Sequence, residues 1–113
     1  IEYNVIYVDF DDCLIINNKI NINLISFLYE CFNRNKRIIL ITKHNSNIYK
    51  SLEKYRLIGL FDKVIHLGLS ENKSDYITEN NSIFIDDSFS ERKKVKLKKK
   101  IPVFSPDMIE VLL

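Results

Sequence analysis

The sequence predicts an α/β protein, a single Rossmann-like domain in which a five-stranded parallel sheet has helices on both faces. Five short apolar, β-branched stretches alternate with stretches whose apolar residues recur at helical spacing. The apolar stretches lack the polar alternation of half-exposed strands, which is typical of strands buried on both faces. A length of 113 residues suits one domain, so we expect residues 1–113 to form one compact unit.

Each expected element has its own local signal. The strands are apolar runs, and the first and fourth end directly in acidic residues; the expected strands are residues 4–10, 37–41, 63–67, 82–85 and 101–104. The first helix, residues 23–35, has Asn23 as its expected cap, and the second, residues 45–56, ends before Gly59, a residue suited to a left-handed conformation. The remaining expected helices are residues 74–79, a helix capped by Ser88 that runs to about Leu97, and a last one that begins at Ser105 and Pro106.

Composition excludes several classes of protein. Hydrophobic residues make up 46% and charged residues 28% of the chain, which is typical of a globular protein and not of a disordered one. No apolar run approaches the roughly 20 residues that span a bilayer, so we expect no membrane association. The two cysteines, Cys13 and Cys31, are too few for a disulfide framework and predict reduced thiols in the cytoplasm.

Carboxylates follow two of the expected strands. Asp9 and Asp11 come after the first strand, and Asp86 and Asp87 come after the fourth. Acidic residues also end strands simply by starting turns, and one such group alone does not decide between the two interpretations. If the two strands are neighbours, however, these carboxylates converge and require a cation. Oxygen-only ligands favour a hard ion, and Mg²⁺ is the expected one.

Four sequence motifs resemble those of the haloacid dehalogenase superfamily. VIYVDFDDCL resembles the first motif, an apolar strand followed by Asp-x-Asp; RIILIT resembles the second, which ends in Thr or Ser. Lys73 in ENKSDYI matches the lysine of the third motif, and IFIDD resembles the paired acids of the fourth. The resemblance covers about residues 5–88 and implies a parallel sheet of strand order 3-2-1-4-5.

The resemblance also implies the roles of the catalytic residues. Asp9 would be the nucleophile that forms an aspartyl-phosphate, and Asp11 would protonate the leaving oxygen and later activate water. Thr42 and Lys73 would hold the phosphoryl group. The activity implied is Mg²⁺-dependent hydrolysis of phosphate monoesters. Lys63 is an alternative third-motif lysine, but it opens an expected strand and so suits the role less well.

The implied metal ligands come from the same two strand ends. Asp9 and Asp87 would bind Mg²⁺ directly, together with the main-chain carbonyl of Asp11. Asp86 would assist through a metal-bound water. One departure from the motif is Cys13, where Thr or Val is usual; a catalytic Cys13 is a rival interpretation, although no neighbouring residue in the sequence indicates a thiolate pair.

The chain has room only for a short element, residues 14–22, where relatives insert a cap domain. The resemblance therefore implies an open site. Such a site suits a large phosphorylated substrate, or a small one such as a sugar phosphate if a second copy of the chain or a partner domain closes over it.

Other functions fit the sequence less well. A receiver domain needs an aspartate at the end of its third strand, where this chain has Gly68. A nucleotide-binding P-loop needs a Gly-rich stretch followed by Lys and Ser or Thr, which this chain with its two glycines lacks. A catalytically silent member of the superfamily remains an alternative that the intact acid set disfavours. The basic run at residues 92–100 lacks interleaved aromatic residues, so nucleic acid is not the expected partner. The role of His44, two residues after Thr42, is left open between a substrate contact and a plain loop residue.

Overall fold

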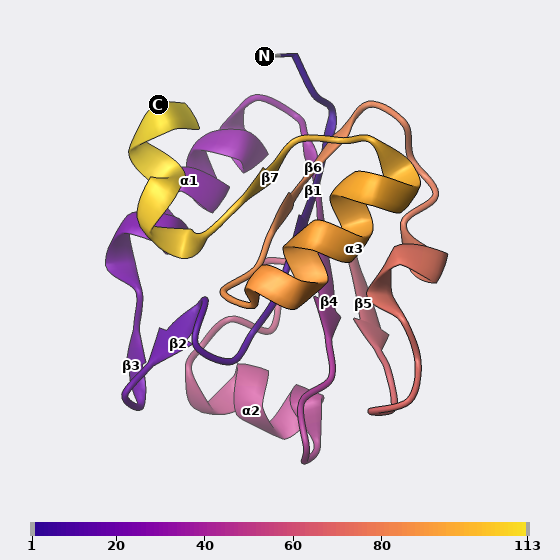
Figure 1. The fold of residues 1–113 in the computed structure, drawn as a ribbon. Coiled ribbons are helices and arrows are strands. Elements are labelled where there is room, and N and C mark those ends of the chain that lie inside the picture. The colour runs from indigo at the N-terminus through magenta and orange to yellow at the C-terminus, as the bar shows by residue number, and fades with distance from the viewer. Residues whose placement is uncertain (1, 113) are drawn as a thin grey trace.

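The central sheet has the predicted parallel topology. A computed structural model describes residues 2–112, so the two ends of the predicted domain, residues 1 and 113, lie outside the described part. The sheet contains β1 (Val5–Val8), β4 (Arg37–Thr42), β5 (Lys63–His66), β6 (Ser82–Ile85) and β7 (Val103–Phe104). Its order is β5-β4-β1-β6-β7, with every pair parallel (Figure 1). Counted along the chain, this is the predicted order 3-2-1-4-5, which is confirmed.

Helices cover both faces of the sheet, as predicted. One face packs against the α-helices α1 (Ile22–Asn33) and α2 (Ile48–Lys54) and the 3₁₀ helix η2 (Pro106–Leu112). The other packs against α3 (Phe89–Lys99), beside which lies the short 3₁₀ helix η1 (Lys73–Tyr76) (Figure 1). The expected helices at residues 74–79 and after Ser105 are thus 3₁₀ rather than α-helical.

Successive residues of each strand point to opposite faces, which divides the core into two clusters. Ile6 and Val8 of β1 belong to the cluster beneath α1 and α2, whereas Val5 and Tyr7 belong to the cluster beneath α3. All four side chains are buried, which explains why the strand shows no polar alternation in the sequence.

Two local predictions about helix ends are wrong. The cap of α1 is Asn21, whose side chain accepts a hydrogen bond from the Leu24 N–H, and not Asn23, which lies within the helix. Gly59 does not adopt a left-handed conformation; Arg56, just beyond α2, does so with φ of 61°. The helix ends earlier than the glycine suggested because Tyr55 already takes the C-terminal cap position.

A small hairpin occupies the position of the expected short element, residues 14–22. β2 (Ile15–Ile16) and β3 (Lys19–Ile20) pair antiparallel, and the two residues between them, Asn17 and Asn18, have φ of 52° and 60°. Positive φ at both central residues is the geometry of the tight hairpin turn that Asn favours. Within residues 2–112, this hairpin is the only element between β1 and α1. In the same range, no helix has the length and apolar character needed to cross a membrane.

Candidate active site

All six side chains predicted for the site line one pocket. β1, β4 and β6 are adjacent and in register, with Val8 opposite both Leu40 and Ile85, so their carboxyl ends meet at one edge of the sheet. The pocket at this edge has a volume of about 270 Å³. The predicted residues that line it are Asp9, Asp11, Thr42, Lys73, Asp86 and Asp87. The six side chains meet because Thr42 ends β4, the four aspartates follow β1 or β6 within three residues, and Lys73 begins η1.

Lys73 lies between two carboxylates beneath the pocket. Its side chain is 3% exposed, and its Nζ lies 2.6 Å from Asp86 Oδ2 and 3.2 Å from Asp9 Oδ1. Burial opposes the charge on Lys73, but the carboxylates of Asp9 and Asp86 outweigh it, so the pKa of Lys73 is raised. Lys63, the alternative lysine, begins β5 and is exposed at the opposite edge of the sheet.

The carboxyl group of Asp9 has an unusual pKa. Burial and the neighbouring Asp86 raise the pKa from 3.8 to about 6, against the opposing effects of Lys73 and of hydrogen bonds from the Phe10 backbone and the Thr42 side chain. The last residue of β6 fixes the main chain of Asp9, because the Asp9 N–H donates to the Ile85 carbonyl at 3.1 Å. A perturbed pKa in a pocket is characteristic of functional sites.

Asp11 is held by His44, a contact that the sequence did not predict. The His44 Nδ1 lies 2.8 and 3.1 Å from the two carboxylate oxygens of Asp11. The His44 Nε2 lies 2.9 Å from the hydroxyls of both Ser46 and Ser51. The loop is anchored at its start, since the His44 N–H donates to Thr42 Oγ1 at 3.2 Å. The one feature of the sequence that could have indicated this contact is the position of His44, two residues after Thr42 at the end of a neighbouring strand.

The paired acids after β6 have different surroundings. Asp86 is 1% exposed; its Oδ1 accepts the Ser88 N–H at 2.9 Å while its Oδ2 binds Lys73. Asp87 is exposed, and its side chain has no hydrogen bond or ion pair within residues 2–112. Arg92 instead donates to the main-chain carbonyls of Asp86 and Asp87, each at 2.8 Å, which fixes the turn. The Asp87 carboxylate is therefore available at the surface of the pocket.

Cys13 does not have the environment of a nucleophile. The thiol is completely buried, and burial, together with the charges of Asp9 and Asp86, raises the pKa of Cys13 well above its ordinary value. Its sulfur lies 3.8 Å from the Ile85 carbonyl, to which the thiol donates. A neutral, inaccessible thiol disfavours the rival interpretation of a catalytic cysteine.

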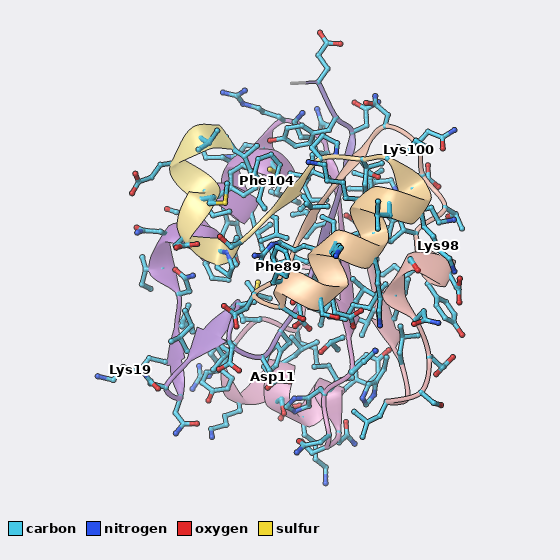
Figure 2. All side chains as sticks on the ribbon, viewed as in Figure 1. Asp11, Lys19, Phe89, Lys98, Lys100 and Phe104 are labelled. Carbon is cyan, nitrogen blue, oxygen red and sulfur yellow. The ribbon has the colours of Figure 1, made fainter. Side chains whose placement is uncertain are left out.

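The basic run lies along α3 and extends away from the pocket. Figure 2 shows Lys98 and Lys100 at the far end of α3 from Asp11. Lys98 forms an exposed ion pair with Asp75 at 3.1 Å, and Arg92 is used by the turn described above. At the pocket itself, Lys43 is paired with Glu91 at 3.0 Å. Most of the run is thus a solvated helix face.

No protein-family model matches the sequence, and no curated protein sequence matches it. Among the solved structures that share its fold are those of two different proteins. One is an uncharacterised protein from Corynebacterium glutamicum, with a TM-score of 0.68, 10% identity, and coverage of 90% of this chain and 82% of that one. The other is the N-terminal part of the protein BF1531 from Bacteroides fragilis, which contains a phosphatase domain complexed with Mg. It has a TM-score of 0.68 and 16% identity over 94% of this chain, which spans only 36% of that structure. These likenesses show a shared α/β fold.

Proposed function

We propose that this protein is a Mg²⁺-dependent phosphatase of the haloacid dehalogenase type, which hydrolyses phosphate monoesters through an aspartyl-phosphate on Asp9. The observation that carries the proposal is the Lys73 bridge between Asp9 and Asp86, in a pocket that Asp11 and Thr42 also line. This set provides a nucleophile, an acid/base and donors for phosphoryl oxygens within one site. The fold shared with a phosphatase domain complexed with Mg supports it.

The donor atoms fit a hard cation. Carboxylates outnumber cations in the pocket lining, because only Lys43 and Lys73 oppose six acidic residues and Lys43 is already paired with Glu91. Among residues 2–112, no three His, Cys, Asp or Glu side chains are arranged closely enough to hold a metal as they stand. We assign the ion to Asp9, Asp87 and the main-chain carbonyl of Asp11, with Asp86 assisting. Mg²⁺ would neutralise charge on the phosphoryl oxygens.

The residues of the chain divide the reaction into two displacements. In the first, an Asp9 carboxylate oxygen attacks phosphorus, the bond to the leaving oxygen breaks, and Asp11 gives that oxygen its proton. In the second, water attacks the aspartyl-phosphate, Asp11 takes a proton from the water, and the Asp9 carboxylate is released with inorganic phosphate. The Lys73 ammonium and the Thr42 hydroxyl donate to the phosphoryl oxygens throughout.

The site is open, so its substrate can be large, or small if a second copy or a partner domain covers the pocket. Within residues 2–112, only the β2–β3 hairpin stands where a lid would be inserted. Excluding water from the aspartyl-phosphate favours some form of closure during turnover.

The test is hydrolysis of p-nitrophenyl phosphate by the purified chain, with added Mg²⁺ and with excess chelator. We expect activity with Mg²⁺ and its loss with chelator; full activity in chelator would contradict the metal dependence. Asp87→Asn is expected to raise the Mg²⁺ concentration for half-maximal activity more than Asp86→Asn does. Equal Mg²⁺ requirements in both variants would contradict the assignment of Asp87 as the direct ligand.

A further inference from the structure

A second and larger cavity opens beside the phosphoryl pocket. This groove, of about 1000 Å³, lies along α1 and is bordered by η2 and by the β2–β3 hairpin. Figure 1 shows η2, in yellow, beside α1, with the hairpin near the beginning of α1. Asp12 and Asp87 line both cavities, so the groove adjoins the pocket in which phosphorus would react.

The groove leads away from the reacting centre along α1. β1 ends at the pocket and β4 begins at the opposite edge of the sheet, where Arg37 pairs with Val5, so α1 runs from the pocket end back across the molecule. Twelve residues at the rise of an α-helix span about 18 Å. Asn23 and Ser26 therefore line the near part of the groove, and Glu30 lines a part farther from the pocket.

Acidic residues outnumber basic ones in the lining of the groove, which also contains apolar side chains such as Phe27 and Ile109. Five carboxylates face two cations: the acids are Asp12, Glu30, Asp87, Asp107 and Glu110, and the cations are Arg34 and Lys36. Lys36 is already engaged, because its Nζ donates to the Tyr3 carbonyl at 2.6 Å and lies 4.0 Å from the centre of the Tyr3 ring. A hydrogen bond from Ser105 lowers the pKa of Asp107, which keeps that acid ionised.

We propose that this groove binds the leaving group of the phosphate ester and accepts a sugar or amino sugar, a hydroxyl-rich group that is neutral or carries an amine. The proposal rests on the phosphatase activity proposed above. Sugar hydroxyls can donate to Glu30 and Glu110 and can accept from the Asn23 amide and the Ser26 hydroxyl. A polyanionic leaving group would instead meet an excess of like charge.

The test compares four phosphate esters on the wild type and three variants. The esters are p-nitrophenyl phosphate as reference, trehalose 6-phosphate, glucosamine 6-phosphate and the 5′-phosphorylated dinucleotide pTpT. Glu30→Lys and Glu110→Lys reverse a charge in the groove, and Glu53→Lys makes the same change on the exposed surface of α2, outside the groove lining. Thermal melting checks that each variant is folded.

In the wild type, we expect a higher kcat/KM for the two sugar phosphates than for pTpT. In Glu30→Lys and Glu110→Lys, the ratio of kcat/KM for trehalose 6-phosphate to that for p-nitrophenyl phosphate is expected to fall about tenfold, and the ratio for pTpT to rise. Glu53→Lys should leave both ratios within about twofold of the wild type.

The outcomes separate this assignment from the proposed function. Suppose that Glu30→Lys and Glu110→Lys hydrolyse p-nitrophenyl phosphate and that their kcat/KM ratios equal those of Glu53→Lys. This result would overturn the groove assignment but not the proposed phosphatase activity. If the wild type had a higher kcat/KM for pTpT than for the sugar phosphates, the proposal that the leaving group is a sugar or amino sugar would be overturned. If the wild type hydrolysed none of the esters with Mg²⁺, the proposed function would fail, and the groove assignment with it.

Discussion

The imidazole of His44 fixes the carboxylate of Asp11, with its Nδ1 2.8 Å from Asp11 Oδ2. Asp11 follows β1 and His44 follows the adjacent β4, so the contact joins two loops at the same edge of the sheet. The Asp11 side chain is 52% exposed and would sample several rotamers, whereas His44 is only 10% exposed. The His44 ring is held by Ser51 and by the edge-to-face contact with Phe10, whose centroid lies 5.0 Å away. We infer that His44 positions the proposed acid/base.

Removing this contact should impair proton donation to the leaving group. For His44→Ala, we expect kcat/KM to fall about tenfold or more on an alkyl phosphate, whose poor leaving group needs a proton, and much less on p-nitrophenyl phosphate. The measurement is the ratio of kcat/KM for the two esters. Asn45→Ala, in the same exposed loop, is the control. An equal fall on both esters would show that His44 supports the site as a whole and does not position Asp11.

Lys73 should be essential to the stability of the metal-free protein. Lys73→Met leaves the carboxylates of Asp9 and Asp86 together without their buried cation, which typically costs about 3–5 kcal/mol. Urea unfolding with excess chelator measures the free energy of unfolding. Lys98→Met is the matched control: its pair with Asp75 is exposed, with 59% and 54% of the two side chains accessible, and should contribute less than about 1 kcal/mol. Similar losses in both variants would contradict the argument.

The positions of the site residues were predictable because strand ends are visible in the sequence. The apolar run before Asp9 and the one before Asp86 end abruptly, and parallel strands place such ends at one edge. That β1 and β6 are neighbours followed from the resemblance, since strand order depends on contacts between residues far apart in the chain. Lys73 followed from the same resemblance.

Loop geometry was not predictable in this way. The contact of His44 with Asp11 joins two loops, and next to Asp11 the chain turns at Asp12, whose φ of 56° is a conformation that a non-glycine residue seldom adopts. The cap at Asn21 was missed because Asn23, two residues later, offers the same side chain. The groove depends on where η2 lies relative to α1, which is set by tertiary packing and leaves no periodic pattern in the sequence.

The raised pKa of Asp9 predicts how stability changes with pH in the metal-free protein. The folded state binds a proton at Asp9 with a pKa of about 6, against the ordinary value of 3.8, so the folded chain binds protons more tightly than the unfolded chain. This contribution is fully present below pH 3.8 and is lost as the pH rises through about 6. Asp9→Asn removes the titration.

With chelator present, we therefore expect the wild type to lose stability relative to Asp9→Asn between about pH 4 and pH 7, by on the order of 2 kcal/mol. Urea unfolding at several pH values gives this difference. Glu53→Gln, an exposed change on α2, provides the baseline. A difference that is constant or grows in the opposite direction would show that Asp9 is not held in this environment.

Asp9 and Asp11 should be separable by trapping the covalent intermediate. They are two residues apart and both line the pocket, but Asp9 is largely buried against Lys73 whereas Asp11 is half exposed and bound to His44. Asp9→Asn removes the proposed nucleophile and should give no covalent phosphate. Asp11→Asn keeps the nucleophile and should still permit slow phosphorylation of Asp9 from an aryl phosphate, whose leaving group needs little protonation. On poor leaving groups, its rate should fall by about a hundredfold to ten-thousandfold, the usual contribution of acid/base catalysis.

Mass spectrometry of the aspartyl-phosphate, or of its beryllium fluoride mimic, measures the outcome in each variant. An adduct on Asp9 in the wild type and in Asp11→Asn, and none in Asp9→Asn, is the expected result. An adduct on Asp11 would reverse the two roles, and this would place the leaving-group proton on the buried carboxyl, whose pKa of about 6 suits a general acid. The trapping experiment therefore decides which of the two aspartates is the nucleophile and which is the acid/base. The contact of His44 with Asp11 favours Asp11 as the acid/base, because a fixed, solvent-accessible carboxyl can exchange protons with both the leaving group and water.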